Sequence, residues 1–87
     1  VIITYLDVPT VTTNAATSVL QRQAVLNGTL NNDGGGPCNC GFEWGTTVAY
    51  GNLTPTQRRI TGQNFSQTIT DLLPGAIYHF RAIANNV

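Results

Sequence analysis

The sequence predicts an all-β domain, and three observations support this. Thr, Val and Ile are abundant, and Gly, Asn and Pro interrupt the chain at short intervals, which is typical of many short strands. Apolar and polar residues alternate over several stretches, as they do in strands with one buried face. No helical apolar period persists along the chain, so no helix is expected.

The N-terminal part contains three expected strands. Residues 1–8 form a strand that is apolar on both faces as far as Asp7. Pro9 breaks it, and residues 10–13 continue as a second extended piece. Apolar residues or glycine then alternate with other residues over 24–30, which indicates a half-buried strand.

The next strands follow a glycine-rich turn. Residues 31–37 include three consecutive glycines, for which positive backbone angles are easy to adopt. Cys40, Phe42 and Trp44 then share one face of a strand, and residues 64–70 form another strand with polar residues facing outward.

The most specific pattern is a corner before the last expected strand. Leu72, Pro74, Gly75 and Tyr78 match the tyrosine corner of Greek-key sandwiches. In such a corner the tyrosine ring packs inward, and its hydroxyl bonds to backbone upstream. Residues 78–84 then alternate as a final strand with Tyr78 on its inner face.

The order and spacing of these pieces resemble a bacterial and archaeal fibronectin type III-like family found in surface and phage-associated proteins. This resemblance implies a seven-stranded, immunoglobulin-like Greek-key sandwich with a spacer or adhesive role, and it brings no catalytic residues. It extends over 9–85 and is carried by 9–17, 26–28, 42–47, Tyr50-Gly51 and 72–82.

Compared with that family, the chain has one strand too few at its C-terminal end and one too many at its N-terminal end. Strands A, B, C, C′, E and F can be placed over 11–85, while residues 1–8 precede strand A. We therefore expect residues 9–87 to form a sandwich that lacks its own last strand and is completed by a donated N-terminal strand, residues 1–8. The interface residues would be Val1, Ile2, Ile3, Thr4, Tyr5, Leu6 and Val8.

The expected function is that of a structural subunit or repeat of an extracellular filament at the cell surface. Its partners would be identical units in a head-to-tail polymer, either separate subunits or tandem repeats of one chain. Because the sequence opens at Val1 rather than Met, we expect either that a leader was removed or that the chain is a piece of a longer one. The rival interpretations are that residues 1–8 extend strand A or form a disordered leader. The alternative function is a carbohydrate- or receptor-binding or spacer module of a larger surface or phage tail protein.

The low charge of the chain argues against nucleic acid and anionic membranes as partners. Charged residues make up 9% of the sequence and the formal net charge is zero, whereas ~25% is usual. Nucleic acid and anionic membranes both require a basic surface, so neither is expected as a partner. No apolar stretch is long enough to span a membrane.

Attached sugar is expected to solubilise this nearly uncharged surface. Three Asn-x-Ser/Thr sequons begin at Asn27, Asn52 and Asn64. The alternation places Asn27 and Asn64 on outward strand faces, and we expect sugar there ahead of Asn52, a loop residue whose sequon is followed by Pro55. O-linked sugar is a further option at Thr10, Thr12 and Thr13.

No pattern in the sequence predicts catalysis, a cofactor or a metal site, so we expect that the chain is not an enzyme. Cys38 and Cys40 are too few for a four-ligand zinc site. They are interpreted as buried free thiols or as pairing with another chain, with a metal half-site or a strained local disulfide as alternatives. His79 has no acidic residue near it in sequence and is expected on the surface, whereas Trp44 is expected in the core.

Overall fold

The computed structural model describes residues 9–86, and these residues contain β-strands and no helix, which confirms the all-β prediction for this part of the chain. The predicted donor strand, residues 1–8, lies outside the described residues. The strands are β1 (Thr10–Thr17), β2 (Ala24–Asn32), β3 (Cys38–Gly45), β4 (Asn52–Leu53), β5 (Gln57–Arg59), β6 (Asn64–Ile69) and β7 (His79–Asn86).

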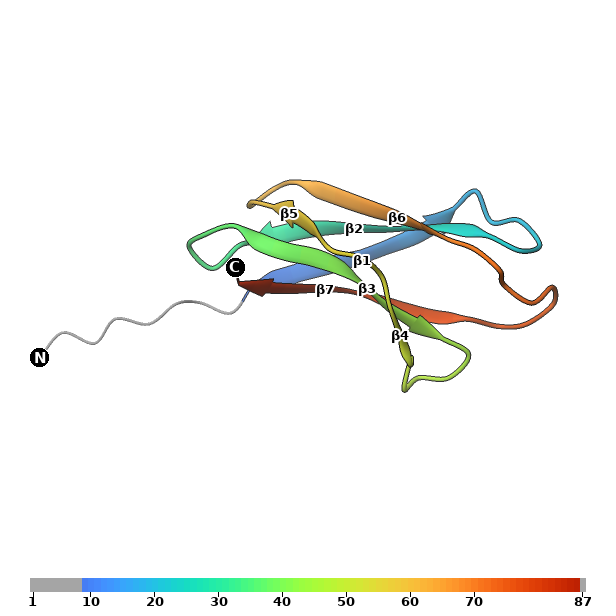
Figure 1. Ribbon diagram of the computed structural model, residues 1–87. Helices are drawn as coiled ribbons and strands as arrows, with labels where there is room; N and C mark the ends of the chain where they lie inside the picture. Colours follow the sequence, from blue (N-terminus) through green and yellow to red (C-terminus); the bar gives the residue numbers. More distant parts are fainter. Residues whose placement is uncertain (1–8, 87) are drawn as a thin grey trace, which may run out of the picture.

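The strands form two antiparallel sheets, an arrangement consistent with a β-sandwich (Figure 1). In the first sheet, β2 lies between β1 and β6. In the second sheet, β3 pairs with β7 along its whole length on one edge. The other edge of β3 pairs with β4 near its end and with β5 near its start.

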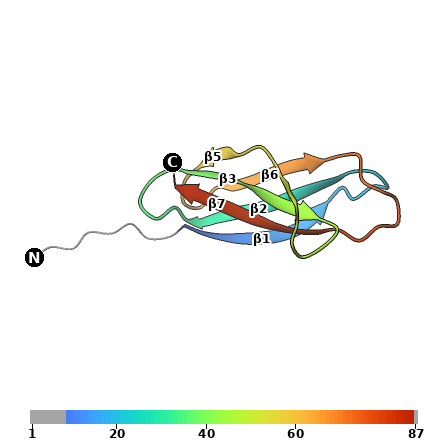
Figure 2. The ribbon, with the colours of Figure 1, turned by 60° about the horizontal axis from the view of Figure 1, so that its bottom comes forward.

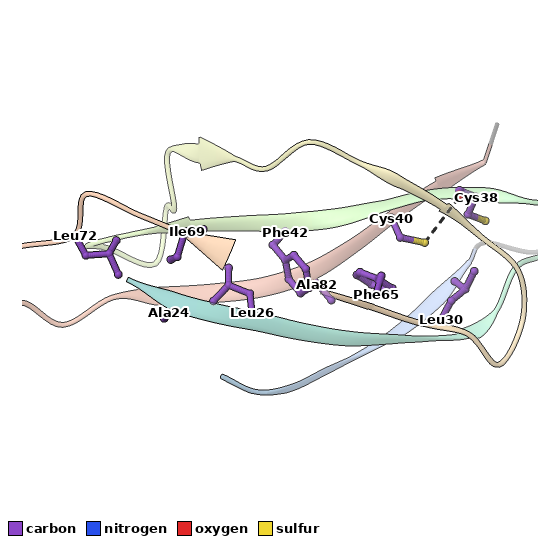
Figure 3. Close-up of a cluster of buried hydrophobic side chains, with 10 residues drawn as sticks. All are labelled: Ala24, Leu26, Leu30, Cys38, Cys40, Phe42, Phe65, Ile69, Leu72 and Ala82. Atoms are coloured by element: carbon purple, nitrogen blue, oxygen red, sulfur yellow. Dashed lines mark hydrogen bonds between the residues drawn. The ribbon is translucent and has the colours of Figure 1, made fainter. Parts of the chain in front are cut away.

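The core lies between the two sheets and receives side chains from both (Figure 3). Phe42 on β3 is fully buried, and its ring centroid is 5.2 Å from that of Phe65 on β6. The other buried members also come mainly from β2, β3 and β7, on the faces that the alternation predicts. The cluster consists of Ala24, Leu26, Leu30, Cys38, Cys40, Phe42, Phe65, Ile69, Leu72 and Ala82.

Gly28 on β2 makes room for the largest side chain of the opposite strand. It lies directly across from Phe65 in the β2–β6 pairing. A Cβ atom at this position would meet Phe65 Cζ at 2.8 Å and the Cβ of Ala82 at 3.0 Å. Glycine at this inward position therefore lets the Phe65 ring lie across β2 and reach the second sheet.

β5 lies beside β6, as Figures 1 and 2 both show. Side-chain bonds join the two sheets there. Arg59 Nε donates to the Asn64 carbonyl oxygen at 3.0 Å, and the Gln57 side-chain amide donates to the Ser66 carbonyl oxygen. The β1 and β7 strands lie on the opposite side of the domain. On the side of the domain where β5 lies beside β6, hydrogen bonds from β5 side chains to β6 backbone carbonyl oxygens thus hold the two sheets together.

The turn after β3 depends on Gly45 and Tyr50. A Cβ atom at Gly45 would overlap the carbonyl oxygen of Tyr50, so only glycine fits there. Tyr50 itself adopts a positive φ of 62°, which is uncommon for a residue with a side chain. Asn52, expected in a loop, instead begins the short strand β4, because the turn returns the chain to the edge of β3 at Trp44.

We predict that Gly28→Ala destabilises the domain by ~1–3 kcal/mol, because the added methyl group overpacks the contact with Phe65. Urea unfolding followed by tryptophan fluorescence would measure the loss. Gly36→Ala is the matched control, since a Cβ there meets no heavy atom within 4 Å. Equal unfolding midpoints for the two variants would show that the close contact at Gly28 is not a packing constraint.

Candidate functional site

One edge of β7 carries no strand among residues 9–86, since β7 pairs only with β3. In an antiparallel pair, every second residue directs its N–H and C=O away from the partner strand. Ala82 is such a residue, because its N–H donates to Thr13 Oγ1 at 2.9 Å rather than to β3. Phe80 and Ala84 have the same parity, so their backbone groups face the same edge.

Thr13 on β1 covers only one position of this edge. Its hydroxyl accepts the Ala82 N–H, but β1 belongs to the other sheet and makes no backbone ladder with β7. No backbone hydrogen bond from the described residues reaches the outward groups of Phe80 or Ala84. Apart from the bond to Thr13, this edge of β7 therefore has no backbone partner among residues 9–86, and exposed edges of this kind are the usual sites of strand addition.

An apolar pocket opens beside the first residues of β7. It has a volume of about 210 Å³ and lies between the end of β1 and the start of β7. Its lining includes Ala16, Leu26, Trp44, Leu72, Tyr78 and Phe80, which come from both sheets and from the corner before β7. An unpaired strand edge and an apolar pocket therefore lie next to each other.

The corner before β7 forms one wall of this pocket. The Leu73 N–H donates to the Tyr78 hydroxyl oxygen at 2.8 Å, Leu72 is buried, and Gly75 adopts a φ of 77°. Pro74 lies between these residues in the turn. We expected a buried Tyr78 ring, but it is only half-buried, because it borders the open pocket 5.9 Å from the Trp44 ring.

The outer face of the first sheet carries a polar ladder instead of ion pairs. Asn14 Nδ2 donates to Thr29 Oγ1 at 3.0 Å, and Thr29 Oγ1 donates in turn to Asn64 Oδ1 at 2.8 Å. These three residues come from β1, β2 and β6, so the ladder crosses the whole sheet. Two of the three sequons lie on this face.

The three sequon asparagines differ in how accessible their amide nitrogens are. Asn27 Nδ2 donates to the Ala15 carbonyl oxygen at 3.0 Å and to Thr17 Oγ1 at 3.1 Å, and the residue is partly buried. Asn52 is exposed, but its amide donates to the Trp44 carbonyl oxygen at 3.2 Å. Asn64 is exposed, and its amide nitrogen donates to none of residues 9–86. Asn64 is therefore the most accessible of the three.

Both cysteines are free thiols in the core. Cys38 Sγ lies 3.2 Å from the Asp33 carbonyl oxygen, and Cys40 Sγ points toward the Cys38 carbonyl oxygen (Figure 3). Burial raises the pKa of both thiols above its ordinary value, and the Asp33 carboxylate adds to this effect at Cys38. No group of three His, Cys, Asp or Glu side chains within 9–86 is placed to hold a metal ion.

A charged cluster lies on the outer face of the second sheet. Arg81 Nη2 is 2.7 Å from Glu43 Oε2, and the Arg81 guanidinium carbon is 4.9 Å from the Tyr50 ring centroid. His79 is exposed on the same face of β7. The sequence reasoning missed this cluster, and only the β3–β7 register, which sets Glu43 opposite Arg81, reveals it.

No protein-family model, curated protein or solved structure matches the chain. The predicted likeness to fibronectin type III-like repeats therefore stays a prediction. Within the described part of the chain, no helix is long and apolar enough to cross a membrane. The geometry at β7 is thus the observation on which a functional proposal depends.

We predict that Cys38 and Cys40 resist thiol reagents in the folded protein, reacting at least ~100-fold more slowly than an exposed thiol, because burial restricts access and disfavours the thiolate. An absorbance assay with an aromatic disulfide would measure both rates, with Thr46→Cys as the exposed reference. In urea, two native thiols per chain should react quickly. Fast reaction without urea, or fewer than two thiols in urea, would contradict this assignment.

Proposed function

We propose that this domain is a fibronectin type III-like sandwich that serves as a structural unit of an extracellular filament. Residues 1–8 of one unit would complete the sandwich of the next by adding a strand to the open edge of β7. The observation that carries this proposal is the unpaired β7 edge beside an open apolar pocket. Its partners are identical units, in separate chains or in tandem.

The strand order supports a Greek-key arrangement of this type. The sheets β1-β2-β6 and β4/β5-β3-β7 correspond to strands A-B-E and C′-C-F of the fibronectin type III-like pattern. In that pattern a further strand, G, lies beside F on the edge away from C. Residues 9–86 provide no strand there, and residues 1–8 have the apolar composition that the position requires.

The energy of donation is large for a domain of this size. Burying about four apolar side chains contributes ~6–12 kcal/mol, at ~1.5–3 kcal/mol for each side chain. The whole stability of a typical domain is ~5–15 kcal/mol. The isolated unit would therefore be poorly stable without a donor, and a filled groove would hold neighbouring units firmly together.

The positions of the strand ends support an in-line polymer. β1 begins and β7 ends at the same end of the domain (Figure 1). The lining of the apolar pocket places it near the other end, where β1 ends and β7 begins. A strand antiparallel to β7 would enter beside Asn86, run toward the pocket, and leave the domain at its far end. Pro9 of the donor's own domain would follow there, so successive units would lie head to tail.

We predict that deleting residues 1–8 abolishes polymers and leaves a poorly folded monomer, because the β7 edge and the pocket are left open. Moving the same residues to a position after Val87, through a short turn, should give a stable monomer that does not polymerise. Native mass, electron microscopy and urea unfolding would measure these outcomes. If the deleted form unfolds at the same urea concentration as the intact chain, or if the intact chain stays monomeric, donation is refuted.

We also propose that the filament carries N-linked sugar, and that Asn64 is modified ahead of Asn27 and Asn52. The exposed Asn64 amide is accessible, whereas the Asn27 amide is held by β1. Peptide mass spectrometry of native material should find added hexose-type mass on the Asn64 peptide. Asn64→Gln should remove it and Asn27→Gln should not. Three unmodified asparagines, or sugar on Asn27 alone, would refute the proposal.

A further inference from the structure

We infer that residues 1–8 bind the open β7 edge in one specific register, with Leu6 opposite Phe80 and Asp7 on the outer face. This inference rests on the function proposed above and specifies how the acceptor selects the donor. Two features of the described residues determine it: which face of β7 is apolar, and where along β7 the pocket lies.

Asp7 fixes which face of the donor strand points inward. In a strand, alternate residues share a face, so the Asp7 side chain points to one face of the strand and those of Leu6 and Val8 point to the other. The inner side of the acceptor is apolar: no polar or charged side chain within 9–86 is buried, and apart from His79 at its rim the pocket is lined by apolar and aromatic residues. An unpaired carboxylate is too costly to bury there. The inward face is therefore the one that holds Ile2, Thr4, Leu6 and Val8.

The pocket fixes the register along β7. Residues directly opposite each other in an antiparallel pair lie on the same face of the sheet. Phe80 and Ala82 face inward, and the pocket lies at the Phe80 end. Placing Leu6 opposite Phe80 brings both Leu6 and Val8 to the apolar pocket. Thr4 then lies opposite the small side chain of Ala82, where its backbone replaces Thr13 as the partner of the Ala82 N–H.

The outer face gains three matched pairs in this register. Asp7 lies opposite His79, a carboxylate beside an imidazole. Tyr5 lies opposite Arg81, whose guanidinium already lies over the Tyr50 ring, so the cation gains a second aromatic neighbour. Ile3 lies opposite Ile83, which adds an apolar cross-strand pair.

Neighbouring registers lose these matches. A shift of one residue exchanges the two faces and turns Asp7 inward. A shift of two residues in one direction sets Ile3 opposite Arg81 and moves Val8 past Tyr78. A shift of two in the other direction leaves Val8 as the main side chain near the pocket and sets Tyr5 opposite Ile83.

Disulfide trapping tests the register in the chain of residues 1–87. The backbone N–H and C=O of Ile83 point toward β3. A donor residue opposite Ile83 on the free edge therefore forms a non-hydrogen-bonded pair with it, in which the two Cα atoms are ~4.5 Å apart. This spacing lies within the usual range for disulfides. The variant Ile3→Cys with Ile83→Cys should give a ladder of covalent oligomers after mild oxidation, seen on a non-reducing gel. The native cysteines are buried, and the oxidised parent chain provides their background.

Two matched variants define the outcomes. Tyr5→Cys with Ile83→Cys and Val1→Cys with Ile83→Cys report the two registers shifted by two residues, and each should give a weaker ladder. A stronger ladder from either variant would overturn the register and leave strand donation intact. A cross-linked monomer from Ile3→Cys with Ile83→Cys would show that residues 1–8 fold onto their own domain, which overturns both proposals.

The choice of face has a separate test. In the chain of residues 1–87, Leu6→Asp should abolish polymers because it directs a carboxylate into the pocket, whereas Asp7→Leu should retain them. The two variants change neighbouring residues of the same strand, whose side chains point to opposite faces of the sheet. Retained polymers with Leu6→Asp and lost polymers with Asp7→Leu would overturn the assignment of the inward face.

Discussion

The pairing of β3 with β7 holds the second sheet together, and most other features of the domain depend on it. Its register sets Phe42 opposite Ala82 on the inner face, so that the core is continuous between the sheets. The same register sets Glu43 opposite Arg81 on the outer face. Because β3 occupies only one edge of β7, it also determines which backbone groups of β7 face away from the sheet. Core, charged cluster and open edge therefore follow from one strand pair.

The sequence predicts those parts of the fold that depend on local pattern. Alternation in β2 and β3 places Leu26 and Phe42 inward, and the structure agrees. Contacts set by long-range register were not predictable, such as the Thr13 hydroxyl at the Ala82 N–H and the Arg81 side chain near Tyr50. The same limit applies to the sequons, since the bonds that hold Asn27 come from β1 and cannot be seen in the alternation of β2.

The surface of the first sheet shows how a chain with few charges holds its strands in register. The Asn14–Thr29–Asn64 ladder links all three strands through amides and hydroxyls. Such neutral hydrogen bonds are not screened by dissolved ions in the way that surface ion pairs are. Arg81 and Glu43 form the only ion pair among residues 9–86. The cohesion of this sheet should therefore change little between dilute and concentrated salt.

The bond between the Thr13 hydroxyl and the Ala82 N–H sets the cost of adding a strand at the middle of the β7 edge. A single neutral hydrogen bond contributes about 0.5–1.5 kcal/mol, so it holds the middle of the edge only weakly. It is too weak to resist a segment that supplies a full backbone ladder and fills the pocket. A threonine hydroxyl is also free to turn to water once it is displaced. In the proposed assembly the donor backbone would therefore replace the Thr13 hydroxyl at the Ala82 N–H.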